Sequence, residues 1–164
     1  MNLIFLDVDG VLNSVNHLIK IYKQTHRPHS NFSYPFDPCC LENLKTLVEK
    51  TNSKLVITST WRIEPVGRQT LLGTLKQYNM DQQVIGWTPI LNTSRGIEIQ
   101  TFLDNFKICR NPNFIILDDD SDMNHLLPHL IKTNAQTGLT RKNVDEAIGK
   151  LNKCISKRHD DFER

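Results

Sequence analysis

The sequence has no apolar stretch long enough to cross a membrane as a helix, so we expect no membrane partner. Its first apolar run follows no basic segment and ends on acidic residues, which is not the pattern of a signal peptide. The motif G-x-x-x-x-G-K-[ST] is also missing, which excludes a P-loop kinase. Together these absences favour a cytoplasmic protein.

Cysteine is scarce, and none of the four cysteines has the C-x-x-C spacing of a zinc site. Cys39 and Cys40 are adjacent, which leaves three interpretations open: a metal-ligand pair, a redox pair, or one buried and one exposed thiol. The reducing cytosol favours the last of these.

Charge of either sign is not in excess, since 20 Lys and Arg residues face 18 Asp and Glu residues, for a net charge of +2. Such a balance neither requires nor excludes a nucleic-acid partner, because global charge is a weak guide to a local patch. No internal repeat or low-complexity linker interrupts the 164 residues. We expect one domain, 1–164, that is large enough to bury a hydrophobic core.

Apolar runs of strand length alternate along the chain with segments of helical periodicity. We expect strands at 3–6, 54–57, 84–85, 114–117 and 129–133, and helices at 14–22, 39–50, 66–79, 96–106 and 140–155. This alternation predicts an α/β fold, with a parallel sheet and helices on both faces. Residues 23–38, rich in proline, histidine and aromatic residues, predict an irregular loop that is a candidate flap.

The most informative segment is the N-terminus, where a buried strand is expected to end on Asp7 and Asp9, followed at once by Gly10. Strand alternation places both carboxylates on one side of the chain. Two like charges so close together favour a bound cation, and Mg²⁺ is the hard ion that carboxylates and phosphates hold. The alternative is a tight acidic turn after a core strand.

Two further strands are expected to end in polar clusters, Thr58 with Ser59 and then residues 118–120. The carboxyl ends of parallel strands meet at one edge of a sheet, where ligands bind. Three such clusters therefore predict one site. Phosphoryl transfer needs a nucleophile, a metal, hydroxyl donors and a cation, and the sequence has a candidate for each.

The D-x-D-G-V-L string that begins at Asp7 resembles motif I of the haloacid dehalogenase-like (HAD) phosphohydrolases. The resemblance implies a Rossmann-like HAD core in which Asp7 is the nucleophile and forms an aspartyl-phosphate. It implies that Asp9 protonates the leaving group and then activates the water. Asp7 and the backbone carbonyl of Asp9 are also implied as Mg²⁺ ligands.

The other motifs of this family follow in order. Thr58 fits motif II as a phosphate donor, with Ser59 as the alternative. Residues 114–119 fit motif IV, in which we expect Asp119 to reach the metal directly and Asp118 to support it, although the reverse order stays open. We interpret Asp120 and Asp122 as indirect metal partners or charges at a helix start.

Motif III is the departure from the family pattern. The family usually has a lysine between motifs II and IV near a helix start, and the best match here is Arg95. Arginine keeps the charge and grips phosphate with two donors. A surface arginine at a helix start is the alternative, and Lys107 and Lys76 are weaker substitutes.

Two strings narrow the resemblance to one branch. T-S-T-W-R at 58–62 and I-L-D-D-D-S-D-M at 116–123 are similar to motifs of the HAD domain in Swiss Army Knife RNA repair proteins. The short gaps between motifs imply an essentially capless core. We expect Gly10, Ser59 and Arg62 to contact substrate. Trp61 either stacks on a base or packs in the core, and Arg62 otherwise pairs with a carboxylate.

These observations predict a Mg²⁺-dependent phosphomonoester hydrolase whose partner is a phosphorylated substrate, a nucleic-acid end or a nucleotide among the candidates. One alternative is a phosphatase of small metabolites or phosphoproteins. Another is a non-catalytic binding module with this fold, which only the Arg95 substitution favours. A receiver-type phospho-acceptor fits poorly because the D-x-D pair comes first in the chain. The oligomeric state is left open.

Overall fold

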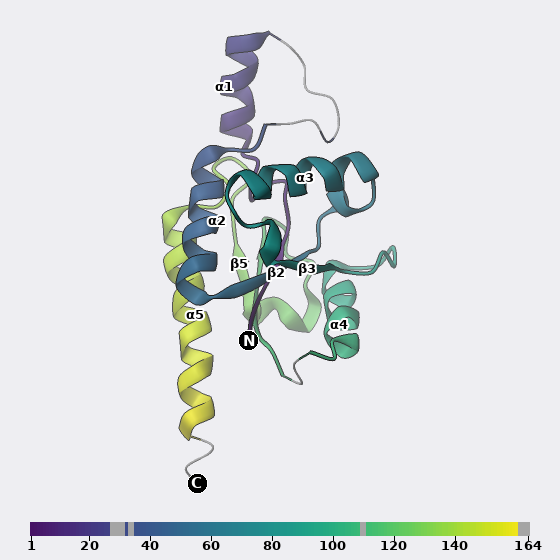
Figure 1. The fold of residues 1–164 in the computed structure, drawn as a ribbon, viewed down its shortest axis with the longest axis vertical. Coiled ribbons are helices and arrows are strands. Elements are labelled where there is room, and N and C mark those ends of the chain that lie inside the picture. The colour runs from purple at the N-terminus through teal and green to yellow at the C-terminus, as the bar shows by residue number, and fades with distance from the viewer. Residues whose placement is uncertain (27–31, 33–34, 109–110, 161–164) are drawn as a thin grey trace.

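The computed structural model describes residues 1–26, 32, 35–108 and 111–160, and its core is a parallel sheet (Figure 1). The strands are β1 (Asn2–Leu6), β2 (Ser53–Ile57), β3 (Val84–Trp87), β4 (Asn113–Asp118) and β5 (Leu130–Lys132). They lie in the order β3-β2-β1-β4-β5, and every pair is parallel. The predicted α/β class and the predicted parallel sheet are therefore confirmed.

The helices are α1 (Val15–Thr25), α2 (Pro38–Thr51), α3 (Pro65–Gln77), α4 (Arg95–Asn105) and α5 (Arg141–Asp160). Helices α1 to α4 lie between successive strands from β1 to β4, and α5 follows β5. Short 3-10 turns lie at Thr60–Arg62 (η1), Asp81–Gln83 (η2) and Asn124–His129 (η3). Each predicted helix and strand has its counterpart, with ends shifted by a few residues. The predicted strand 129–133, for example, shortens because η3 includes His129.

Alternate residues of the strands bury two separate hydrophobic clusters, one on each face of the sheet. On one face, Ile4 and Leu6 of β1 pack with residues of α2, α3 and α5 such as Leu44. On the other face, Leu3 and Phe5 pack with α4 and η3. Apolar side chains on both sides of each central strand explain why these strands read as continuous apolar runs.

Local sequence signals explain where the helices begin. Asp37 caps α2 by accepting a hydrogen bond from the Cys39 amide, and Pro38 occupies the first turn, where no amide donor is needed. Pro65 likewise occupies the first turn of α3, although the side chain of Glu64 at its N-cap makes no capping hydrogen bond. Ser14 caps α1 by accepting from the His17 amide.

Helix α1 differs from the others because none of its residues is buried. Figure 1 shows α1 at the top of the molecule, projecting away from the layers around the sheet. The segment that follows it contains most of the predicted flap, 23–38, and lies largely outside the described residues. Of the part beyond α1, the structure describes His26, Phe32 and residues 35–38.

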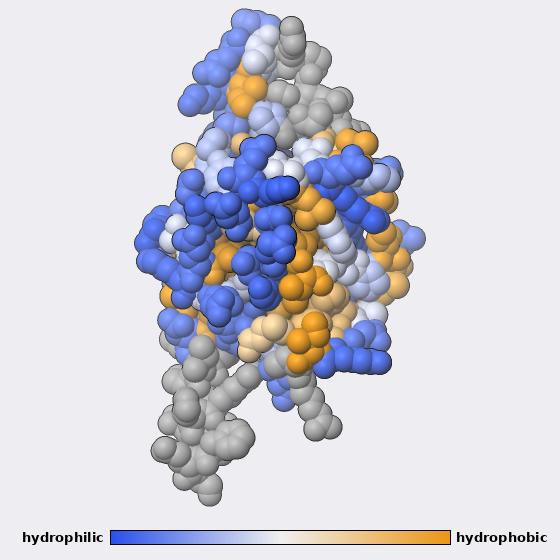
Figure 2. Space-filling model, viewed as in Figure 1, coloured by the Kyte–Doolittle hydropathy of each residue, from blue (hydrophilic) through white to orange (hydrophobic). Residues whose placement is uncertain are grey.

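On the face seen in Figure 2, polar side chains cover most of the surface and apolar side chains reach it in smaller areas between them. Within the described part of the chain, no helix combines the length and the apolar character that a membrane crossing requires.

Candidate active site at the carboxyl edge of the sheet

The candidate site lies at the carboxyl edge of the sheet, at the point where the order of the strands reverses direction. The connection that leaves β1 leads to β2 on one side, whereas β4 pairs with β1 on the other side. Asp7 follows β1, Thr58 follows β2 and Asp118 ends β4. The backbone pairing continues to this edge, since the Asp7 amide donates to Leu117 O at 3.0 Å. Such a switch point is where open α/β sheets bind ligands.

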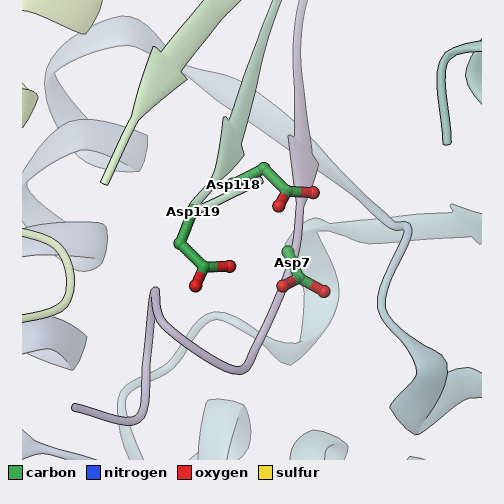
Figure 3. Close-up of side chains that lie close together, drawn as sticks. All are labelled: Asp7, Asp118 and Asp119. Atoms are coloured by element: carbon green, nitrogen blue, oxygen red, sulfur yellow. The ribbon is translucent and has the colours of Figure 1, made fainter. Parts of the chain in front are cut away.

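Three carboxylates meet at this edge. One oxygen each from Asp7, Asp118 and Asp119 lies within 4.8 Å of the other two (Figure 3). Figure 3 shows the three carboxylates turned towards a shared space at the ends of β1 and β4. Asp7 and Asp118 are buried and Asp119 is half-buried.

Burial makes the ionised form of these carboxylates costly. It raises the pKa of Asp7, although Arg95 and the Ser59 hydroxyl act in the opposite direction. Burial and the nearby charge of Asp7 raise the pKa of Asp118 to about 7. Burial also raises the pKa of Asp119. A cation bound in this cluster would therefore stabilise the ionised carboxylates.

Arg95, at the start of α4, is the cation of this site. Its Nη1 atom lies 2.9 Å from Asp7 Oδ1, 3.2 Å from Thr58 Oγ1 and 3.3 Å from Asp118 Oδ2. Burial opposes the positive charge, but the carboxylates of Asp7 and Asp118 outweigh it, so the pKa of Arg95 is raised. Of the two interpretations, the surface arginine is therefore wrong, and the side chain lies in the site.

The start of α4 is fixed by the loop after β4. The Arg95 amide donates to Asp122 Oδ2 at 2.9 Å, and the Gly96 amide donates to Asp122 O at 3.1 Å. A side chain at position 96 would overlap the backbone of Met123, so only glycine permits this approach. The interpretation of Asp122 as a charge at a helix start is confirmed.

The residues of this cluster fit a divalent metal ion. Three carboxylates face one guanidinium, and all the available ligand atoms are oxygens, which suit Mg²⁺. The buried Asp118 Oδ2 accepts no hydrogen bond within the described part of the chain, although Arg95 Nη1 is near. Asp7, Asp118 and Asp119 would hold the ion. Gly10, with φ of +73°, makes room for Asp119, because a side chain there would overlap the Asp119 carboxylate.

Asp9 is not one of the three clustered carboxylates, although its charge is near enough to help burial raise the pKa of Asp119. Its Oδ1 accepts a hydrogen bond from Asn13 Nδ2 at 3.0 Å, and its Oδ2 accepts one from Trp61 Nε1 at 2.9 Å. The side chain of Asp9 is exposed to solvent. The expected metal contact through its backbone carbonyl stays a prediction.

Thr58 and Ser59 follow β2 and face Asp7. Arg95 Nη1 donates to Thr58 Oγ1 at 3.2 Å, and hydrogen bonding from the Ser59 hydroxyl acts to lower the pKa of Asp7. Ser59 Oγ also caps the η1 turn by accepting from the Trp61 amide at 3.4 Å. The structure therefore brings both candidate hydroxyls of motif II, Thr58 and Ser59, to the site. Which of the two donates to phosphate stays open.

Arg62 does not reach the carboxylate cluster, so its predicted contact with substrate does not fit this geometry. Its five N–H donors are all engaged: they bond to the carbonyl groups of Thr58, Ser59, Thr88 and Pro89 and to the Glu98 carboxylate. Only 4% of the residue is exposed. Arg62 pairs with a carboxylate, as the alternative interpretation had it, and joins the ends of β2 and β3 to α4.

Trp61 is fully buried, which excludes stacking on a nucleic-acid base and confirms the core interpretation. Its ring centroid lies 5.0 Å from that of Phe36 and 5.3 Å from that of Phe32. The sequence did not predict the contact between Trp61 and Asp9. It did not predict the roles of Asn13 and Glu98 either, because no motif marks those two residues.

The adjacent cysteines are a buried and an exposed thiol, as the favoured interpretation had it, and both are free. Burial and the nearby Asp37 carboxylate raise the pKa of Cys40 to about 12. At neutral pH, Cys40 is therefore a protonated thiol, unsuited to metal binding or nucleophilic attack.

A profile of the family described as the HAD domain in Swiss Army Knife RNA repair proteins matches residues 3–144. The matched segment begins at the second residue of β1, includes β2 to β5 and ends inside α5. A search of curated proteins found no match.

Proposed function

Because this chain belongs to the family of HAD domains in Swiss Army Knife RNA repair proteins, we propose that it is a Mg²⁺-dependent phosphomonoester hydrolase acting through an aspartyl-phosphate on Asp7. HAD domains are generally phosphohydrolases. The observation that carries the proposal is the convergence of Asp7, Thr58 and Asp118 on Arg95 Nη1, at 2.9, 3.2 and 3.3 Å.

In the first step, an oxygen of Asp7 attacks phosphorus and the bond to the leaving oxygen breaks. Arg95 and Thr58 donate hydrogen bonds to the phosphoryl oxygens, which carry the developing charge. Asp9 supplies the proton that the leaving oxygen needs. A bound Mg²⁺ would neutralise the phosphate charge that otherwise repels Asp7.

In the second step, water attacks the phosphorus of the aspartyl-phosphate. Asp9, which lost its proton in the first step, accepts a proton from this water, so the enzyme returns to its starting state. Inorganic phosphate leaves and the Asp7 carboxylate is restored. Asp9 can serve both steps because it is exposed and lies outside the three clustered carboxylates.

The proposed substrate is a phosphate at a nucleic-acid end or on a nucleotide. Two observations support it: the description of the matching family, and the solvent exposure of Asp9 beside the half-buried Asp119. A phosphatase of small metabolites or phosphoproteins is the second candidate. The binding-module alternative rested on the arginine at motif III, and the contacts of Arg95 with Asp7 weaken it.

The proposal is tested by phosphate release from a substrate panel with Mg²⁺ or with EDTA. The panel contains p-nitrophenyl phosphate, mononucleotides, and oligonucleotides with a 5′- or a 3′-phosphate. We expect release that EDTA stops, with an oligonucleotide or nucleotide preferred. Release that survives EDTA would contradict the metal role, and a preference for p-nitrophenyl phosphate would contradict the proposed substrate class.

A further inference from the structure

Both oxygens of the Asp9 carboxylate are held by side-chain donors. Trp61 Nε1 donates to Oδ2 at 2.9 Å, and Asn13 Nδ2 donates to Oδ1 at 3.0 Å. Two donors on opposite oxygens fix the plane of the carboxylate. An exposed aspartate beyond a strand end would otherwise rotate freely about its side-chain bonds.

The two donors are themselves buried and packed. Trp61 is fully buried, and the rings of Phe32 and Phe36 pack against it at centroid distances of 5.3 and 5.0 Å. Asn13 is 3% exposed, and its carbonyl accepts from the Gly10 amide at 3.0 Å, which closes the turn around Asp9. The indole N–H can only donate, so its bond to Asp9 Oδ2 has one direction.

We infer that Trp61 and Asn13 are positioning residues that orient the Asp9 carboxyl group for proton transfer to the leaving oxygen. This inference rests on the proposed function. Asp9 needs such support because its side chain lies outside the cluster of Asp7, Asp118 and Asp119, where a metal ion would orient a carboxylate. Misplacement of a catalytic group by about 1 Å costs on the order of 100-fold in rate.

The readout is the dependence of kcat/KM on the leaving group. A leaving group such as 2,4-dinitrophenolate departs without a proton, whereas an alkoxide needs one. We expect Trp61→Phe, which removes the indole donor and keeps an aromatic ring, to lower kcat/KM for a nucleoside 5′-phosphate about 10- to 100-fold. For 2,4-dinitrophenyl phosphate we expect a change of at most about threefold, since no proton transfer is needed.

Two controls separate positioning from general damage. Trp87→Phe changes the chain's other tryptophan, which lies in β3, and should leave the ratio between the two substrates unchanged. In an Asp9→Ala background, Trp61→Phe should cause no further selective loss, because a residue that acts through Asp9 has nothing left to orient. If Trp61→Phe does not fold, Asn13→Ala removes the other donor and takes its place in both experiments.

A second readout needs no turnover. Trp87→Phe leaves Trp61 as the only tryptophan, so its indole Nε1–H resonance can be assigned in a ¹⁵N NMR spectrum. Asp9→Ala should shift that resonance by removing its acceptor. An unchanged resonance, or equal losses for both substrates in Trp61→Phe, would overturn the inference. Absence of turnover by the wild type with every substrate would instead overturn the proposed function, and the positioning role with it.

Discussion

Arg95 Nη1 lies 2.9 Å from Asp7 Oδ1, although the two residues are 88 positions apart in the sequence. The contact exists because Asp122 and the small Gly96 bring the start of α4 against the loop after β4. The sequence predicted that Arg95 takes the place of the lysine usual in the family, and this assignment stays a prediction. The planar fork of Arg95 can bind Asp7 and a phosphoryl oxygen at the same time.

Arg95→Ala should weaken phosphate handling much more than Arg95→Lys. Loss of a donor to the transferring phosphoryl group costs on the order of 100- to 1,000-fold in kcat. Lysine keeps the charge and one donor, so its loss should be smaller. Steady-state kinetics and inhibition by inorganic phosphate would measure both effects, and equal losses would show that Arg95 is not the phosphate-binding cation.

Asp118→Asn should stabilise the metal-free protein more at pH 8 than at pH 5. The pKa of Asp118 is raised to about 7 by burial and by the charge of Asp7. Between pH 4 and 7 the folded state keeps a proton that the unfolded state releases, so this carboxylate makes the fold less stable as pH rises through that range. Asparagine removes this effect, which is on the order of a few kcal/mol at pH 8.

Thermal or urea unfolding in EDTA at both pH values would measure the change. Asparagine retains an acceptor for the Asp120 amide, which bonds to Asp118 Oδ1 at 2.9 Å, so the turn after β4 is kept. A variant that is less stable than the wild type at pH 8 would contradict the electrostatic account of the cluster.

Glu98→Ala should destabilise the fold by about 3–5 kcal/mol, because it leaves the Arg62 guanidinium buried without its carboxylate. Glu98 also accepts a hydrogen bond from the Leu91 amide at 2.9 Å, which would be lost. A matched control is Asp145→Ala, which breaks the exposed pair with Arg141 and should cost less than about 1 kcal/mol. Urea unfolding of both variants checks this, and similar losses would show that the buried pair has no special structural role.

The sequence predicted the strands and their polar ends well because these signals are local. The apolar run before Asp7 and the run before Asp118 each fix a strand and its end without any distant partner. The rule that parallel strands end at one edge then brings Asp7, Thr58 and Asp118 together. The expectation that Arg95 lies in the site depended on family resemblance, since nothing local distinguishes it from a surface arginine.

The contacts that were missed join residues far apart in the chain. Arg62 pairs with Glu98 across 36 positions, and Trp61 meets Asp9 across 52 positions. Whether an arginine next to a site faces substrate or the interior depends on the burial of its guanidinium. That burial is set by how η1, the end of β3 and α4 pack, and no periodicity in the sequence encodes it.

The most direct test of the account is Mg²⁺-dependent phosphate release by wild type and by Asp7→Asn, with circular dichroism to verify that both are folded. Asparagine is close to aspartate in shape, but it lacks the anionic oxygen that attacks phosphorus. We expect release by the wild type and none by Asp7→Asn. Undiminished release by folded Asp7→Asn would contradict the covalent mechanism.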